Sequence, residues 1–216
     1  MIAAEVSNTK FKKIDTIKVD INLRRDAKGC TCMQSAIPLE PHPYRLTERM
    51  QHWATVSPDK IFIAQRTQDP ASGKNNGAWE SLTHAEVFKK VKHIAQALLN
   101  KDVSPERPVA ILSENSIEHG LMALAALHIG IPYSSIAPPY SLRSAGFEKL
   151  RHVIGLLTPG LVFVQDGELY KQALLTIPND VEIVIVKNKP GNLHAILFDE
   201  LLQTPVTNEV DKAFAS

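Results

Sequence analysis

The four residues Val109-Ala110-Ile111-Leu112 form a short, uninterrupted apolar run, and the segment around them decides the fold. Such a run is typical of a strand that is covered on both faces, as in a parallel sheet. Ser113–Asn115 then turn the chain, and Gly130 is expected to end the helix that follows. The apolar residues of that helix recur at helical spacing: Ile117, Leu121, Leu124 and His128. Residues 109–130 are therefore predicted to form one strand–helix unit.

The alternation of strand and helix patterns continues to Leu202. Further strands are predicted at 131–136, 161–164 and 181–186, and further helices at 147–157, 169–177 and 198–202. Strands that alternate with helices imply right-handed crossovers and a mostly parallel sheet with helices on both faces. The predicted fold class is therefore α/β.

The chain before residue 109 carries a second set of patterns. Ile61–Ala64 and Trp79–Leu82 are predicted to form a hairpin, with the polar stretch 69–77 as its tip. Thr83 and Glu86 have the spacing of a capping box at the start of a helix. That helix carries an apolar stripe at helical spacing: Val87, Val91, Ile94 and Leu98.

A shorter helix is predicted after Tyr44 and ends before Pro58. Its apolar residues are expected to pack on the core: Leu46, Met50, Trp53 and Ala54. Residues 1–45 mix lysines, β-branched runs and a proline cluster, so they are interpreted as an N-terminal extended arm. Residues 46–216 are interpreted as the main domain.

Composition excludes several classes of function. The net charge of +1 with 44% hydrophobic residues gives no basic surface for nucleic acid. Cys30 and Cys32 are one residue apart with no second pair, so we expect reduced thiols rather than a zinc site. The N-terminus lacks the apolar run of a signal peptide, and the most apolar stretch, 121–136, is too interrupted to span a membrane. The expected location is the cytoplasm.

The residues after the 109–112 strand are the first candidates for chemistry. Ligands of such sheets bind beyond the carboxyl ends of the strands, which places Ser113, Glu114 and Asn115 at a candidate crevice. Glu118 and His119 are the nearest other titratable residues, but neighbours on a helix point about 100° apart. Helix capping, with Asn115 as the cap, is therefore favoured over catalysis.

Other motifs also favour structural interpretations. His128 lies on an apolar stripe and is interpreted as a packed, hydrogen-bonded core residue. Gly73 and Lys74 lack the first glycine and the following Ser/Thr of a phosphate-binding loop, and no G-x-S-x-G sequence occurs. No residue is therefore assigned a catalytic, cofactor-binding or metal-binding role.

Several blocks, in this order and spacing, resemble a known family. They include YRLTER at Tyr44–Arg49, ILSENSIEH at Ile111–His119, GIPY at Gly130–Tyr133, KLRHV at Lys149–Val153 and LTPGLVF at Leu157–Phe163. Together they resemble the N-terminal part of acyl-CoA synthetases of the adenylate-forming superfamily, in particular feruloyl-CoA synthetases. Glu114 and the stretch 134–139 depart from the pattern of that family.

The resemblance implies ATP-dependent activation of a carboxylate to an acyl-adenylate, followed by thioester formation with coenzyme A. ATP, magnesium and coenzyme A are the cofactors of the complete family member, and an aromatic carboxylate is its substrate. The phosphate loop, the ribose-binding aspartate and the C-terminal lysine domain have no matching positions in these 216 residues. We therefore expect an N-terminal fragment that is inactive alone and pairs with the missing C-terminal part. The alternative is a non-catalytic α/β binding or structural module derived from such an enzyme.

Overall fold

The computed structural model describes residues 20–67, 76–143 and 146–216, and the chain divides into two compact units, Met1–His42 and Pro43–Ser216. Within the first unit, β1 (Ile21–Arg25) and β2 (Thr31–Ser35) form an antiparallel hairpin that the sequence patterns did not predict. Its turn is closed by Asp26, whose Oδ1 accepts hydrogen bonds from the amides of Lys28 and Cys30. Gly29 adopts a positive φ of 83°, which suits glycine.

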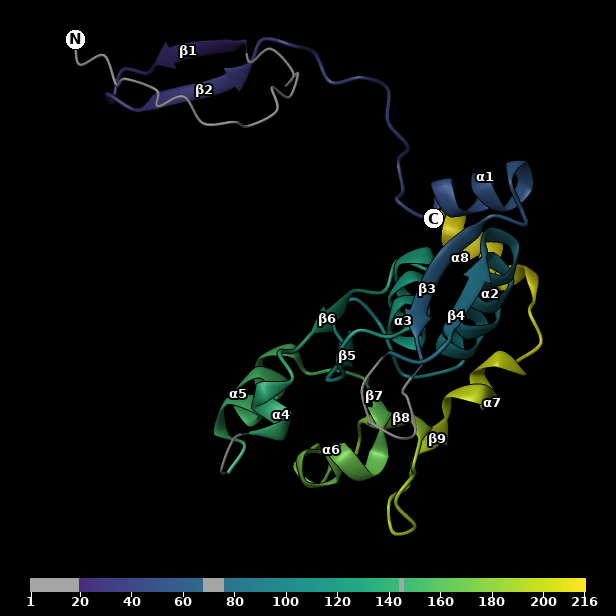
Figure 1. Cartoon of the computed structure of the whole chain (residues 1–216). Coiled ribbons are helices and arrows are strands. Elements are labelled where there is room, and N and C mark those ends of the chain that lie inside the picture. The colour runs from purple at the N-terminus through teal and green to yellow at the C-terminus, as the bar shows by residue number, and fades with distance from the viewer. Residues whose placement is uncertain (1–19, 68–75, 144–145) are drawn as a thin grey trace, which may run out of the picture. The chain divides into compact units, whose positions relative to one another are not determined.

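The second unit contains a parallel sheet with the strand order β6-β5-β7-β8-β9. The strands are β5 (Val109–Ile111), β6 (Tyr133–Ser135), β7 (Leu161–Asp166), β8 (Glu182–Lys187) and β9 (Ile196–Leu197). Figure 1 shows how the helices are arranged around these strands. The predicted α/β class and parallel sheet are confirmed, and β9 is an addition to the prediction.

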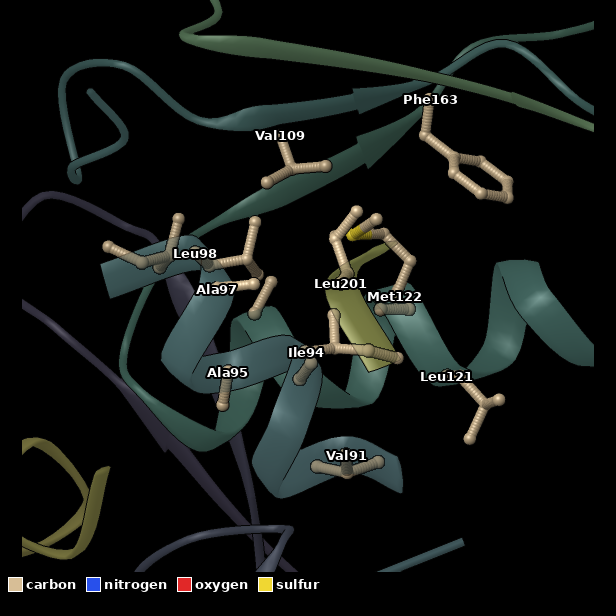
Figure 2. Close-up of a cluster of buried hydrophobic side chains, with 14 of the residues drawn as sticks. Val91, Ile94, Ala95, Ala97, Leu98, Val109, Leu121, Met122, Phe163 and Leu201 are labelled. Atoms are coloured by element: carbon tan, nitrogen blue, oxygen red, sulfur yellow. The ribbon is translucent and has the colours of Figure 1, made fainter. Parts of the chain in front are cut away.

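One face of the sheet is covered by α2 (His84–Leu99), α3 (Ile117–His128) and α7 (Phe198–Leu202). The odd-numbered residues of the central strands point to this face: Val109, Ile111, Leu161 and Phe163. Figure 2 shows two of them, Val109 and Phe163, in the same cluster as Leu98, Met122 and Leu201 from the helices. This cluster is the larger part of the core.

The opposite face is covered by α5 (Glu148–Leu157) and α6 (Gly167–Leu174), next to the short helix α4 (Pro139–Leu142). The even-numbered strand residues belong to this second cluster: Ala110, Leu112, Val162 and Val164. Because both faces are buried at the centre of the sheet, β5 and the buried parts of β7 and β8 are continuously apolar rather than alternating, as the sequence indicated.

A second sheet consists of the antiparallel hairpin β3 (Ile61–Arg66) and β4 (Trp79–Thr83), which contacts α2 and α3. The hairpin prediction is confirmed, while most of its predicted tip at 69–77 lies outside the described residues. The capping box is also confirmed: Thr83 Oγ1 accepts from the Glu86 amide at 3.3 Å, and Glu86 Oε2 accepts from the Thr83 amide at 2.8 Å. All four predicted stripe residues of α2 are fully buried.

Two local predictions were wrong. The cap of α3 is Ser116 and not Asn115, because Ser116 has extended backbone angles and its hydroxyl accepts from the His119 amide at 3.1 Å. In α1 (Glu48–Val56) only Met50 is buried, whereas Trp53, and Leu46 before the helix, are exposed. The predicted stripe therefore does not pack on the core as a whole.

The helix α8 (Asn208–Ala215) was not predicted, and polar contacts from α2 hold the segment that leads into it. The buried Gln96 Oε1 accepts from the amide and the hydroxyl of Thr207, at 2.9 and 2.7 Å. His93 Nδ1 lies 2.8 Å from the Thr204 carbonyl, and Lys92 pairs with Asp211 at 3.0 Å. No helix within the described ranges is both long enough and apolar enough to cross a bilayer.

His128 is packed in the core, as expected, and joins α3 to α8. Its ring stacks on Phe214 with centroids 4.6 Å apart and meets Phe88 edge-on at 6.0 Å. Its Nδ1 atom has no hydrogen-bond partner among the described residues, so the expected hydrogen bond there is not found. Burial, with the nearby Lys92, lowers the pKa of His128 to about 4.

We expect Thr83→Ala to destabilise the protein, because the Glu86 amide loses its side-chain acceptor. The expected loss is about 1 kcal/mol in the free energy of unfolding, measured by urea titration. Thr55→Ala is the control, because Thr55 is an exposed threonine within a helix. Its hydroxyl donates a hydrogen bond to the Gln51 carbonyl one turn earlier and caps no helix. Equal losses in the two variants would contradict the capping role.

Stability is expected to fall below pH 6.5 because of His128. The folded state keeps this ring neutral down to a pKa of about 4, whereas the unfolded chain takes up a proton near 6.5, so acid favours unfolding. Relative to His128→Phe, the native chain should lose roughly 1 to 2 kcal/mol of unfolding free energy between pH 7 and pH 5. Parallel pH profiles of the two proteins would show that the histidine is not held neutral.

Candidate functional site

The order of the strands locates the most suitable edge for a ligand. β5 is the first strand of the parallel sheet along the chain. The next strand, β6, pairs with one edge of β5, and the strand after it, β7, pairs with the other edge. This reversal separates the loops at the carboxyl ends of β5 and β7, where open α/β sheets bind ligands. We call the carboxyl ends of β5, β6 and β7 the switch-point edge.

Ser113 and Tyr170 hold the centre of this edge. Ser113 follows β5, is buried, and its hydroxyl accepts a hydrogen bond from the Gln165 amide of β7. Tyr170 of α6 is also buried, and burial together with the Glu114 carboxylate raises the pKa of its phenol, an effect that a backbone hydrogen bond with Glu114 opposes. The Glu114 turn is thus anchored to α6.

His119 connects the loop after β5 to the end of β6. Its Nδ1 lies 3.1 Å from the Glu114 carbonyl, and its Nε2 lies 3.1 Å from Ser135 Oγ. Because a carbonyl only accepts, Nδ1 is the donor to the Glu114 carbonyl, and the Ser135 hydroxyl can pair with Nε2 as either donor or acceptor. The sequence did not pair Ser135 with His119, because the two residues lie 16 positions apart.

Asp166, Asn188 and Gly167 shape the other side of the edge. One Asp166 oxygen caps α6 by accepting from the Leu169 amide at 3.1 Å, and the other accepts from Asn188 Nδ2 at 2.8 Å. A Cβ at Gly167 would lie 2.7 Å from the Asn188 carbonyl oxygen. Only glycine allows the loops after β7 and β8 to approach this closely.

The three titratable residues that the sequence singled out are only partly brought together. His119 contacts the backbone of Glu114 and not its carboxylate, and Glu118 Oε2 is buried without a hydrogen-bond partner among the described residues. The edge gathers hydroxyls, one imidazole and the carboxylates of Glu114 and Asp166. Such a set donates and accepts hydrogen bonds, but its negative charge disfavours a bare polyphosphate.

A hollow of about 610 Å³ lies elsewhere, at the amino ends of β8 and β9. Its charged groups are already paired: Lys101 with Glu182 at 2.6 Å, and Asp180 with Arg107 at 3.2 Å. Because parallel sheets bind ligands at the opposite ends of their strands, we assign no site to this hollow.

Metal ligands do not cluster in the part of the chain that the structure describes, where no three His, Cys, Asp or Glu side chains converge. Cys30 and Cys32 are free and exposed. The absence of an assigned catalytic, cofactor-binding or metal-binding residue stays a prediction.

Comparison with known proteins gives a consistent match. Residues 50–212 match the model of the family described as AMP-binding enzyme. Luciferin 4-monooxygenase of Luciola mingrelica is 30% identical over 110 residues, which cover 50% of this chain and 19% of that protein. The dimodular nonribosomal peptide synthase of Bacillus subtilis (strain 168) is 27% identical over 110 residues, covering 51% and 4%.

Solved structures share the fold. A Rhodopseudomonas palustris CGA009 protein assigned as a long-chain-fatty-acid CoA ligase has a TM-score of 0.57 and 20% identity, over 77% of this chain and 38% of that one. The luciferase-like enzyme of the Zophobas morio mealworm has a TM-score of 0.54 and 20% identity, over 79% and 37%. The chain therefore spans much less than half the length of these relatives.

We expect Gly167→Ala to disturb the switch-point edge, because the added Cβ meets the Asn188 backbone. The predicted cost is roughly 1 to 3 kcal/mol in the free energy of unfolding. Gly155→Ala is the matched control, since a Cβ there meets nothing within 4 Å and alanine favours the helix. Thermal melting that shows Gly167→Ala to be as stable as Gly155→Ala would contradict the close approach.

Proposed function

Since the chain belongs to the AMP-binding enzyme family, we propose that it is the N-terminal part of an ATP-dependent acyl-CoA ligase of the feruloyl-CoA synthetase type. The observation that carries the proposal is the family match over residues 50–212, combined with the shared α/β fold. The complete enzyme would activate an aromatic carboxylate as its adenylate and then form a coenzyme A thioester. A cytoplasmic location is part of the same proposal.

The finer assignment depends on the blocks quoted above, chiefly Ile111–His119 and Gly130–Tyr133. These blocks coincide with structural elements: the first runs from Ile111, the last residue of β5, through the turn with Ser113 to the start of α3, and the second connects α3 to β6. Their contribution to the enzyme is to position the switch-point edge.

The switch-point edge does not fit a magnesium–triphosphate group by itself. Both Asp166 oxygens are engaged, by the α6 amide and by Asn188, and Ser113 is occupied by the Gln165 amide, so the exposed Glu114 supplies the one carboxylate of this edge that is not engaged among the described residues. Magnesium usually needs free carboxylates together with substrate phosphates. We therefore propose that ATP and magnesium are held by the remaining part of the synthetase, and we derive no catalytic step through them here.

We predict that the purified chain shows no carboxylate-dependent exchange between ATP and labelled pyrophosphate, with ferulate or octanoate as the acid. A complete AMP-binding ligase is the positive control. Adding a polypeptide that carries the remaining part of a feruloyl-CoA synthetase, here termed the complement polypeptide, should restore ferulate-dependent exchange. Robust exchange by the chain alone would contradict its dependence on a partner, and no gain with the complement polypeptide would contradict the feruloyl assignment.

A further inference from the structure

Large apolar side chains gather on one surface of the second unit. Five of them, from α1, β3 and β4, are between 41% and 63% exposed: Trp53, Val56, Ile61, Phe62 and Trp79. We call this surface the hairpin face; its three elements lie near one another in Figure 1. Several exposed large apolar side chains on neighbouring elements of a folded protein are typical of a surface that contacts another polypeptide.

Two side chains of the hairpin face contact the same imidazole, and Arg66 Cζ lies 4.6 Å from the centroid of the Trp79 ring. The Phe62 ring meets His84 edge-on with centroids 5.3 Å apart, and Trp53 lies 6.2 Å from the same imidazole. A β-bulge between Ile61 and Ile63 leaves Phe62 unpaired, while Ile63 packs on the core beside Gly120. The bulge thus allows Ile63 to be buried while Phe62 stays on the surface.

One polar atom next to the hairpin face lacks a hydrogen-bond partner among the described residues. His84 Nδ1 is buried and has no hydrogen-bond partner among the described residues. Buried polar atoms are almost always paired, so an unpaired nitrogen beside exposed aromatic rings indicates a missing neighbour.

The backbone of this hairpin has free edges. β3 and β4 pair only with each other in the described part of the chain, so their outer edges present unpaired amides and carbonyls. A two-stranded sheet is marginally stable without further strands or packing, and an open edge is a template for another strand.

We propose that the hairpin face is the docking surface for the remaining part of the adenylate-forming fold, which adds strand and apolar side chains to β3 and β4. This inference rests on the proposed function. Its support is the fold comparison: the chain is matched over 77% of its length, yet it covers only 38% of the ligase structure. Most of that fold thus lies outside the matched part, and an aromatic-rich surface is what a buried interface requires.

Both tryptophans of the chain, Trp53 and Trp79, belong to the hairpin face, so they report on it directly. The chain is labelled with 5-fluorotryptophan, and the two ¹⁹F resonances are assigned with Trp53→Phe and Trp79→Phe. The unlabelled complement polypeptide is then titrated in. We expect both resonances to shift and to lose their sensitivity to exchange of H₂O for D₂O as the rings leave water.

Two variants make the experiment specific. Phe62→Asp places a charge in the hairpin face and should weaken binding of the complement polypeptide roughly tenfold or more. Leu156→Asp is the matched control, because Leu156 is exposed on α5, away from this face, and its binding should be unchanged. Circular dichroism and thermal melting of both variants verify that they remain folded.

The outcomes separate this inference from the proposed function. Shifted resonances without restored pyrophosphate exchange would support the docking surface and contradict the function. Restored pyrophosphate exchange with unchanged ¹⁹F resonances would support the proposed function and contradict the docking surface. Two results overturn the docking proposal: no binding of the complement polypeptide, or identical shifts produced by an unlabelled second copy of this chain, which would make the face a homodimer interface.

Discussion

The structure depends on the burial of β5 on both of its faces. Val109, Ala110 and Ile111 are fully inaccessible, with β6 on one side and β7 on the other. Successive residues of β5 belong to opposite hydrophobic clusters. Val109 and Ile111 lie in the cluster on the α2 and α3 side, and Ala110 lies in the cluster on the α5 and α6 side. At about 25 cal/mol per Å² of apolar surface, burial of this kind is the dominant stabilising term. The parallel sheet and the position of its switch point follow from this strand.

Features encoded locally could be predicted from the sequence. The apolar runs predicted the strands β5, β7 and β8, because the part of a strand that is covered on both faces is continuously apolar. The capping box at Thr83 and Glu86 was recognisable because both partners lie within one helical turn. The cap of α3 was misplaced by one residue, since Asn115 and Ser116 are both good caps and only the backbone angles distinguish them.

Features made by distant residues could not be predicted. α8 is short, and its position depends on Gln96 and His128, which lie far away in sequence. In the candidate site, Ser113 meets Gln165 across 52 positions, and His119 meets Ser135 across 16. Spacing along the chain contains no information about such contacts until the strand order is known. The sequence therefore located the edge of the sheet and named Ser113 and His119, but it did not identify the residues that they contact.

The two sheets in the second unit of this AMP-binding family member differ in how completely they are covered. The parallel sheet is packed on both faces, whereas the β3–β4 hairpin exposes an aromatic surface and two open edges. Native-state hydrogen exchange of the free chain tests this difference most directly. The account predicts that amides of β5 and β7 exchange only on global unfolding, and that amides of β3 and β4 exchange about 100-fold faster or more through local opening. Equal protection of the hairpin and the parallel sheet would contradict it.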